Sequence, residues 1–322
     1  MPTALSAPTA PVILATHTTP AKAPLANSQA GDAAVRLRQG LTETLGRLAT
    51  GAAPVVVAPP GELGARGGGH FHLVPELFLQ LAGRTDFRFP QGGLRLHAGQ
   101  AALLPPRLLH AERVMAGAAG QPFCNLVVQA DGPRLTCHLA HEATPGQPGI
   151  LHLEALHHPR AESIHGWLGD AARLGQAAPG TPWAAQQARG LVCAAVAGVL
   201  QLLDDRAANA LAEPPLLARL RVLVQNQLGD AGLSVRGLAL QSGCTADHLS
   251  FVFSQHSGEP LVAHINRLRL ARAAHLLRDT GMAAKEVAWA CGFATPSYFS
   301  RCFRQQHGLT PKAWRAAAGA KA

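Results

Sequence analysis

Three features that the sequence lacks narrow the class of protein. The 322 residues contain no apolar run that approaches the roughly 20 residues of a membrane-spanning helix, which predicts a soluble protein without membrane contact. The first positive charge is Lys22, which follows the only apolar stretch of the N-terminal segment, and that order is not typical of a secretion signal. No two of the 6 cysteines stand at a metal-finger or redox spacing, which indicates reduced, mostly buried thiols of a cytoplasmic protein: Cys124, Cys137, Cys193, Cys244, Cys291 and Cys302.

Basic charge is present but unevenly distributed. The formal net charge is +9, and residues 214–322 hold 13 Lys and Arg against 5 Asp and Glu, an excess of eight. Residues 1–213 hold the other 15 and 14, an excess of one. A basic module attached to a near-neutral one indicates a polyanion partner for the C-terminal third. Charge alone does not distinguish nucleic acid from an acidic membrane.

Composition divides the chain into five segments. The N-terminal tail is rich in Ala, Pro and Thr, as disordered segments are, and the polar stretch before residue 216 ends in a Pro pair that breaks a helix. The expected segments are a disordered tail over 1–31, a strand-rich domain over 32–158, a helical dimerisation or packing segment over 159–205, a linker over 206–215 and a basic domain over 216–317.

The N-terminal half combines helices with many short strands. Residues 32–49 predict an amphipathic helix, and residues 54–140 hold short apolar or alternating runs between Gly, Pro, Asp and Asn, which are typical of a β-sandwich or barrel. Residues 159–205 return to helical texture, and one apolar stripe there either forms a dimer seam or packs within its own domain. The first helix is expected to bury Val35, Leu41, Leu45 and Leu48, and the stripe consists of Leu191, Ala195, Val199 and Leu202.

The C-terminal domain contains a repeat, "LALQSGCTADHLSFVFSQHSG" and "VAWACGFATPSYFSRCFRQQHG". Each copy predicts a short helix, a turn with Gly, and a second helix that Thr245 or Thr295 caps, which is a helix-turn-helix. Residues 259–278 predict a connecting helix of roughly 30 Å, close to the roughly 34 Å between successive major-groove faces of a duplex. Its apolar stripe is Leu261, Ile265, Leu268, Ala273, Leu276 and Leu277, with Arg267, Arg269, Arg272 and Arg278 around it.

Residues 216–316 resemble the DNA-binding domain of the AraC family of bacterial transcription regulators. The second copy carries that family's signature at Ala288, Gly292, Phe293, Tyr298, Phe299, Arg301, Phe303, Gly308, Pro311 and Arg315. The resemblance implies seven helices, two of which read bases in the major groove. An all-α C-terminal domain behind a strand-rich one makes the expected fold class α+β.

The resemblance also implies which side chains meet DNA. The base-reading positions are Asp247, Ser250 and Phe251 in the first unit and Pro296, Ser297 and Arg301 in the second. Arg301 suits a two-pronged contact with guanine, Asp247 suits a cytosine amino group, and phosphate contacts fall to Arg304, Lys312 and Arg315. The first unit departs from the family because residues 245–257 contain no Arg or Lys. DNA affinity is therefore expected to depend mainly on the second unit. Phe251 either contacts a thymine methyl group or is buried, and we expect burial.

The stretch "GGGHFHLVPELFLQLAG", residues 67–83, places two histidines and a glutamate close together. Read as one strand over 70–80, it sends His70, His72 and Glu76 to one face and an apolar row to the other. The apolar row requires a cover, either the helix at 32–49 or a dimer partner. The opposite face suits a small-molecule pocket inside a barrel.

The spacing of Gly64, His70, His72, Glu76 and Gly83 resembles the first motif of the cupin superfamily. A second motif follows at Gly99, Pro105 and His110, with Arg107 where the family has glycine and Val114 where it has asparagine. The resemblance implies a cupin-like barrel in which His70, His72, Glu76 and His110 hold a metal; the set suits Zn, Fe, Mn or Ni. Whether a metal binds or the histidines shape a metal-free ligand site stays open. The remaining histidines, including His138, are assigned to the surface or to loops.

Together these patterns predict a sequence-specific transcription regulator. Its cupin-like N-terminal domain would sense a small molecule, with or without a metal, and its expected partners are double-stranded DNA, the effector, a second copy in a homodimer and RNA polymerase. No catalytic residue is assigned, so no enzyme is expected. The alternatives are a metal-dependent cupin enzyme fused to a DNA-binding domain, and a constitutive DNA-binding protein whose barrel is a dimer scaffold.

Overall fold

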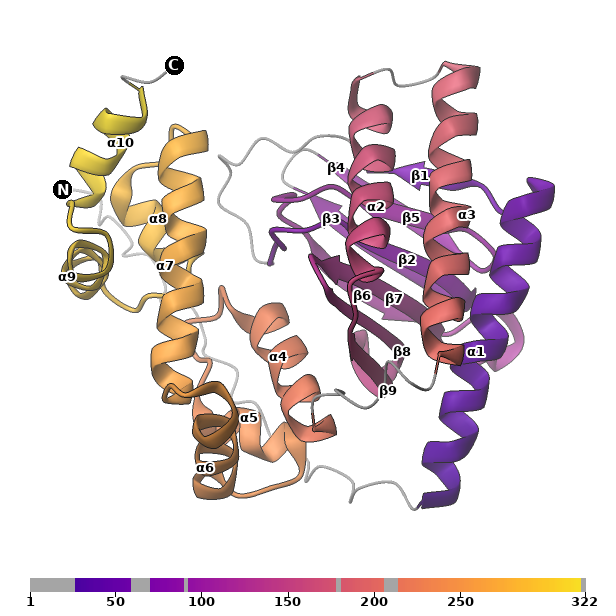
Figure 1. Ribbon diagram of the computed structural model, residues 1–322, viewed down its shortest axis with the longest axis horizontal. Helices are drawn as coiled ribbons and strands as arrows, with labels where there is room; N and C mark the ends of the chain where they lie inside the picture. Colours follow the sequence, from indigo (N-terminus) through magenta and orange to yellow (C-terminus); the bar gives the residue numbers. More distant parts are fainter. Residues whose placement is uncertain (1–26, 59–69, 90–91, 178–180, 206–213, 320–322) are drawn as a thin grey trace, which may run out of the picture.

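The computed structural model describes residues 27–58, 70–89, 92–177, 181–205 and 214–319. Within these ranges the chain forms a strand-rich N-terminal region with helices α1 to α3 and a helical C-terminal region, α4 to α10 (Figure 1). This mixed architecture confirms the expected α+β class. The predicted tail over 1–31 lies outside the described residues as far as residue 26, and so do residues 206–213 of the predicted linker.

The strands form two sheets. The larger sheet has the order β1-β5-β2-β7-β8-β9, with β1 parallel to β5 and every other neighbouring pair antiparallel. The smaller sheet has the antiparallel order β4-β3-β6. The strands are β1 (Val55–Val57), β2 (Glu76–Ala82), β3 (Arg84–Phe89), β4 (Gly92–His97), β5 (Ala101–Leu104), β6 (Ala111–Met115), β7 (Cys124–Asp131), β8 (Arg134–Thr144) and β9 (Gln147–His157), with a short 3-10 turn η1 (Ala118–Gly120).

An apolar core fills the space between the two sheets. Phe78 of β2 meets Phe87 of β3 edge to face, with ring centroids 4.9 Å apart, and Val127 of β7 packs into the same cluster. Alternate residues of β2 therefore point in opposite directions, because Leu77 and Leu79 belong to a second cluster under the helices. The short strands predict a β-sandwich or a barrel, and two packed sheets are compatible with that prediction.

Helices α1 (Asn27–Thr50), α2 (Ala161–Ala177) and α3 (Pro182–Asp204) cover the outer face of the larger sheet (Figure 1). The helix predicted over 32–49 is present as α1, and it covers the apolar row of β2. Its predicted buried face is wrong at Val35, which is 63% exposed. Ala33 and Leu37 are buried instead, with Leu41 and Leu48, because they recur at helical spacing along the sheet.

Helix α3 is the one helix in the described ranges that is long and apolar enough to cross a membrane, with a mean hydropathy of 1.2. Its apolar side packs instead on the sheet and on α2, since Ala195, Val199 and Leu202 are buried there. Three of the four residues of the predicted dimer seam thus pack within the domain. Leu191 is only partly buried.

The C-terminal region begins earlier than the predicted boundary. Pro215 is the first residue of α4, where its missing N–H costs no hydrogen bond, so it opens a helix and is not part of the linker. Helix α4 packs on β9 through Ile150 and Leu153. The helices are α4 (Pro215–Gln227), α5 (Val235–Ser242), α6 (Ala246–Ser257), α7 (Leu261–Asp279), α8 (Ala284–Ala290), α9 (Pro296–His307) and α10 (Pro311–Gly319).

Candidate functional site

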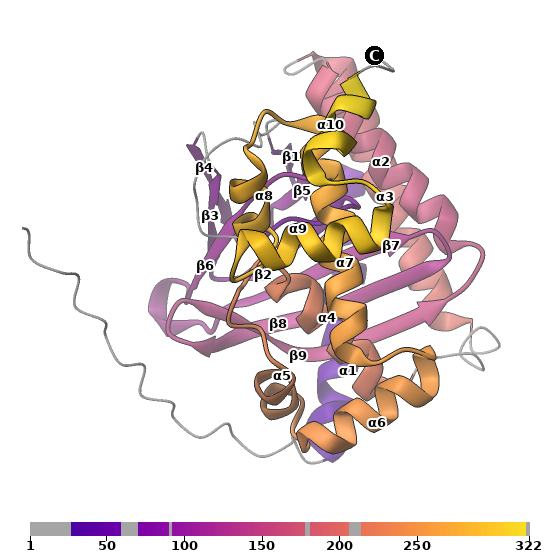
Figure 2. The ribbon, with the colours of Figure 1, turned by 90° about the vertical axis from the view of Figure 1, so that its left-hand side faces the viewer.

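Two helix-turn-helix units, α5–α6 and α8–α9, form where the sequence repeat predicts them. The Thr245 hydroxyl accepts a hydrogen bond from the His248 amide at 3.3 Å, and the Thr295 hydroxyl accepts one from the Tyr298 amide at 3.4 Å. Both threonines therefore cap the second helix of their unit, as predicted. Helix α7 joins the units, and Figure 2 shows α6 and α9 across the face that is turned away from the sheets.

The predicted base-reading side chains differ in exposure. Asp247, Ser297 and Arg301 are exposed, whereas Ser250 and Pro296 are half-buried. The expected burial of Phe251 is wrong, because Phe251 is 63% exposed. Leu249 and Phe253 occupy the buried side of α6 instead, and Phe251 lies two positions from each of them and so on a different face.

The predicted phosphate contacts divide into two groups. Arg304 and Lys312 are exposed and lie outside the core. Arg315 instead donates from Nε to the Leu277 carbonyl at 2.9 Å and from its other end to the Met282 carbonyl. The structure therefore corrects the phosphate assignment of Arg315: its guanidinium joins α10 to the end of α7 and the segment that follows it.

The histidine segment is not the continuous strand that its alternation predicts. Strand β2 starts only at Glu76, because the chain bends at residues 73–74 and Pro75 has no N–H for the ladder. His70 pairs with His110 through two backbone hydrogen bonds of 2.8 and 2.9 Å, and the Arg107 amide donates to the His72 carbonyl at 2.7 Å. These bonds bring the histidines to the end of β2.

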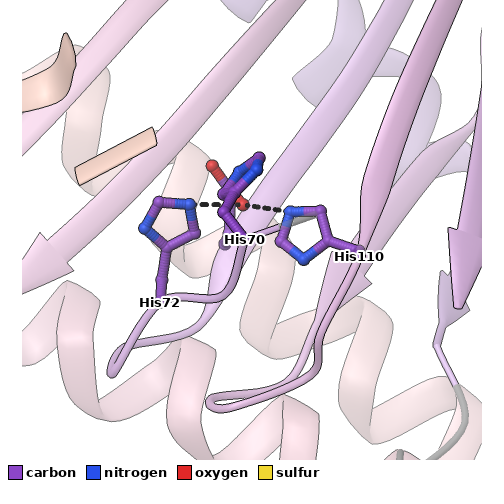
Figure 3. Close-up of side chains that lie close together, drawn as sticks. His70, His72 and His110 are labelled. Atoms are coloured by element: carbon purple, nitrogen blue, oxygen red, sulfur yellow. Dashed lines mark ion pairs between the residues drawn. The ribbon is translucent and has the colours of Figure 1, made fainter. Parts of the chain in front are cut away.

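The four side chains of the predicted metal site converge. One potential ligand atom from each of His70, His72, Glu76 and His110 lies within 4.8 Å of every other. The Oε2 atom of Glu76 is 3.4 Å from His72 Nε2 and 3.4 Å from His110 Nε2. Figure 3 shows the three imidazole rings around one point, where the two dashed contacts of Glu76 meet. Gly64 of the implied motif lies outside the described residues.

Three of the atoms that face this point have no hydrogen-bond partner among the described residues, whereas two of the atoms behind them do. His72 Nε2, Glu76 Oε2 and His110 Nε2 are the buried atoms of this kind. His110 Nδ1 lies 2.9 Å from the Leu108 carbonyl and so carries the proton, and Gln129 Nε2 donates to Glu76 Oε1 at 2.8 Å. Outer hydrogen bonds of this kind orient metal ligands in proteins. The residues present therefore fit a divalent metal ion.

Burial and mutual repulsion keep two of the imidazoles neutral. Burial lowers the pKa of His72 to about 4, although Glu76 acts in the opposite direction. Burial, followed by His110 and His72, places the pKa of His70 well below its usual value. At His110 the attraction of Glu76 outweighs burial and raises the pKa. Neutral imidazole is the form that binds metal, so His70 and His72 are ready ligands at neutral pH.

Two further titratable groups surround the cluster and were not assigned to it from the sequence. Glu112 Oε1 lies 3.9 Å from His70 Nε2 and 3.8 Å from His110 Nε2, and burial, followed by Glu76, raises the pKa of Glu112 to about 7. His138 of β8, assigned to the surface or a loop, is buried, and burial lowers its pKa to about 4. Glu112 could have been assigned to the cluster from the sequence, because residues two apart on a strand, such as His110 and Glu112, point to the same face.

The C-terminal region is similar to known helix-turn-helix proteins. A family model described as a helix-turn-helix domain matches residues 238–317. The chain is 40% identical over 67 residues to an uncharacterized HTH-type transcriptional regulator, YpdC of Escherichia coli, covering 21% of this chain and 24% of that protein. It is 37% identical over 71 residues to the HTH-type transcriptional activator RhaR of Cronobacter sakazakii, covering 22% and 25%.

Part of the chain is also similar to a solved structure. A transcriptional regulator of the AraC-type DNA-binding-domain proteins from Chromobacterium violaceum is 29% identical, with a TM-score of 0.31, over 32% of this chain and 92% of that chain. The chain spans about a quarter of the length of the two curated relatives, and both matches cover short segments only.

Proposed function

From the premise that residues 238–317 are an AraC-type helix-turn-helix domain, we propose that the protein is a sequence-specific, DNA-binding transcription regulator. The observation that carries this proposal is the placement of α6 and α9 on one outer face (Figure 2). Helix α7 has 19 residues. At 1.5 Å per residue it is about 28 Å long, near the roughly 34 Å between successive major-groove faces. A duplex could therefore meet both helices without displacing the sheets.

The two units would contribute different chemistry to this contact. In α9, exposed Arg301 would donate to guanine O6 and N7, while Arg304 of α9 and Lys312 of α10 would neutralise phosphate. In α6, Asp247 would accept from a cytosine amino group, and exposed Phe251 would contact a thymine methyl group. Ser250, Pro296 and Ser297 would line the same grooves.

The DNA proposal predicts selective binding by the full-length protein. Duplexes bound at physiological salt would be selected from a random pool and sequenced. We expect two enriched blocks about one helical turn, 10–10.5 base pairs, apart. Recovery of unenriched sequence would contradict the proposal, because charge-driven binding alone has no base preference.

The N-terminal region would act as the sensor. We propose a cupin-like domain in which His70, His72, Glu76 and His110 hold a Zn, Fe, Mn or Ni ion. Three buried ligand atoms without partners in the described part of the chain support this site. Such an ion would supply an open coordination position for an oxygen or nitrogen atom of a small-molecule effector. An effector that binds one domain arrangement more tightly than another would shift the population toward it and so change DNA binding.

The metal proposal has a direct chemical test. Protein purified without an affinity tag would be measured by elemental analysis beside a His70→Ala/His72→Ala variant. We expect near-stoichiometric metal in the parent and its loss in the variant. A metal-free parent that stays metal-free after incubation with each of the four ions would contradict the proposal.

The remaining partners follow from the same role. RhaR is named a transcriptional activator, and activation by this chain would require contact with RNA polymerase in the cytoplasm. A homodimer would double the number of reading helices on an operator. Its surface would lie outside the buried stripe of α3, since that stripe packs inside the domain.

A second candidate is a metal-dependent enzyme fused to the DNA-binding domain. Glu112 favours it, because its buried carboxyl group lies 3.9 Å from His70 Nε2 and 3.8 Å from His110 Nε2, where it could exchange a proton with a group bound beside the metal. Turnover of a metabolite by the metal-loaded protein would establish this candidate. Turnover that is equally fast in Glu112→Gln would remove the reason to propose it.

A further inference from the structure

The loops that carry the imidazoles also make one of the contacts between the strand-rich region and the helical region. We call residues 70–72 and 107–110 the histidine loops. Within them His70, His72 and His110 point into the cluster, whereas the intervening side chains of Phe71 and Leu109 belong to the apolar core of the second helix-turn-helix unit. That core is made by α7 to α10 and includes Phe299 and Phe303. The sheet domain thus completes the core of a DNA-reading unit.

Phe71 has a specific partner in α7. The Arg272 guanidinium carbon lies 3.4 Å from the centroid of the Phe71 ring, and Arg272 is 1% exposed. Within the described ranges none of its three side-chain nitrogens has a hydrogen-bond partner. Burial lowers the pKa of Arg272 to about 10, so the group still carries its charge at neutral pH. A buried cation without hydrogen bonds is costly, and the ring face is the attraction that offsets part of this cost. The contact therefore depends closely on where Phe71 sits.

Arg107 links the same loops to the end of α7. It is the one non-glycine residue in the described part of the chain with a positive φ, 68°, at the position where the cupin motif has glycine. Its amide donates to the His72 carbonyl at 2.7 Å, and its guanidinium lies 2.6 Å from Asp279 Oδ2. The ion pair gives a reason for an arginine in a conformation that side chains disfavour.

The first helix-turn-helix unit rests on a different part of the sheet domain. Its core contains Ile150 and Leu153 of β9 and, among the described residues, none from the histidine loops. The two units are therefore held at separate places, and the second one shares its support with the histidine cluster.

We propose that the histidine loops are the docking surface of the second helix-turn-helix unit, and that a divalent metal in the cluster sets how tightly this unit is held. The proposal rests on the metal site proposed above. Residues 71–75 belong to no strand, and in the described part of the chain the backbone bonds beside Phe71 are the three that His70 and His72 make with residues 107–110. An ion that holds the side chains of His70 and His72 would fix the backbone between them and keep the ring against Arg272. Without the ion the loop is freer, and Arg272 gains access to water.

By thermodynamic linkage, the coupling between metal binding and docking of the second unit is reciprocal. If the ion favours the docked unit by a given factor, then docking strengthens binding of the ion by the same factor. A change on α7, in the other domain from the ligands, must therefore alter metal affinity. It would also loosen the orientation of α9 relative to α6, and with it the preferred spacing on DNA.

The first test follows hydrogen exchange in the full-length protein with Zn²⁺ as the probe. We expect the amides of residues 270–290 to exchange about tenfold faster in metal-free protein than in Zn²⁺-loaded protein. Residues 217–227 of α4, which rest on β9, should show no change. In Phe71→Ala, residues 270–290 should exchange rapidly in both states.

The second test measures Zn²⁺ affinity in two matched variants of α7. Arg272→Lys keeps the charge but loses the planar group on Phe71, and we expect Zn²⁺ to bind about fivefold to tenfold more weakly. Arg267→Lys, on the same helix but paired with Glu259, should bind Zn²⁺ like the parent.

The outcomes separate the two proposals. Stoichiometric Zn²⁺ binding with equal exchange in both states and equal affinity in Arg272→Lys would overturn the coupling and leave the metal site intact. Absence of Zn²⁺ binding in the parent would overturn both the metal site and its control of docking. Exchange over residues 270–290 that is as slow in Zn²⁺-loaded Phe71→Ala as in the Zn²⁺-loaded parent would overturn the docking surface itself.

Discussion

The two helix-turn-helix units share a frame, by which we mean the glycines that end their helices and their buried aromatic residues. Their exposed surfaces differ. Gly258 and Gly308 end α6 and α9 in the left-handed region, with φ values of 70° and 71°. Phe253 and Phe303 are both fully buried at matching positions. The exposed side chains differ: α6 offers Phe251 and no Lys or Arg, whereas α9 offers arginines. The repeated residues therefore fix where each helix lies, and the exposed side chains decide which chemical groups the helix presents.

The units also differ in what holds them to the sheets. The first leans on β9 through α4, and the second shares a core with the histidine loops. Within the described residues, the histidine loops contribute to the core of the second unit and not to the core of the first. Because the second unit also carries the arginines, the unit that would dominate DNA affinity is the one that the histidine loops contact.

The largest expected effect concerns the shared frame. Phe253→Ala and Phe303→Ala each remove a fully buried aromatic ring, and each should lower the free energy of unfolding of the helical region by about 3–5 kcal/mol. Urea titration followed by circular dichroism measures both. If one variant loses stability and the other does not, the two cores are not equivalent.

Replacing the turn glycines, Gly243 in the first unit and Gly292 in the second, should lower stability by different amounts. A Cβ added at Gly243 (φ 71°) would meet no atom of the described residues within 4 Å, so Gly243→Ala should cost only the backbone strain, about 1–2 kcal/mol. A Cβ on Gly292 (φ 76°) would lie 2.6 Å from the Leu228 carbonyl oxygen, which adds about 1–3 kcal/mol of steric cost. Equal unfolding free energies for the two variants would show that the second turn yields without cost.

Substitutions on the exposed faces of α9 and α6 should weaken DNA binding by different amounts. Arg301→Ala should weaken binding to the selected operator by about 1–3 kcal/mol and relax preference at one guanine, since a two-pronged contact is lost. Phe251→Ala removes one apolar contact and should cost less, with its effect at a thymine. Fluorescence anisotropy on operators with single base changes measures both. A larger loss in Phe251→Ala would reverse the assigned roles.

A smaller effect distinguishes a phosphate contact, assigned to Lys312, from a structural role, assigned to Arg315. Lys312→Ala should weaken binding to all duplexes alike and reduce the slope of affinity against salt by about 1. Arg315→Ala should leave the salt slope unchanged and lower the melting temperature, because Arg315 donates to the Leu277 and Met282 carbonyls. An altered slope in Arg315→Ala would return it to the phosphate contacts.

The smallest effect belongs to the first unit alone. Glu259 follows Gly258, and hydrogen bonds from Arg267 and then His264 lower the pKa of Glu259 to about 2. Because the folded-state pKa lies below the ordinary 4.5, the stabilisation is full above pH 4.5 and is lost as the pH falls toward 2. For this partly exposed pair it amounts to about 0.2–1 kcal/mol. Acid unfolding of Glu259→Gln, which lacks this pH dependence, provides the measurement.

What could be predicted from the sequence was mostly local. The repeat identified both helix-turn-helix units and their Thr245 and Thr295 caps, because capping depends on residues within one turn. The spacing of His70, His72 and Glu76 indicated a cluster that the structure does bring together. The proposed metal at this cluster remains a prediction.

What failed depended on contacts across the chain. Periodicity located α1 but not its buried side, since Val35 and Leu37 are both apolar and only the sheet decides between them. The exposure of Phe251 is an exception, because the sequence held a signal for it: Phe253 matches Phe303 in the repeat, and Phe251 lies two positions away on another face of the helix. The contact of Phe71 with Arg272 joins positions about two hundred residues apart, and no local pattern encodes such a pair.

The most direct measurement is selection of bound duplexes from a random pool with the full-length parent and with Arg301→Ala in parallel. If the second unit dominates DNA reading, the parent should select two blocks about one helical turn apart, and the variant should lose the guanine of one block while it keeps the other. Selection of the same two blocks by both proteins, with the guanine retained, would contradict the assignment of α9 as the principal reader.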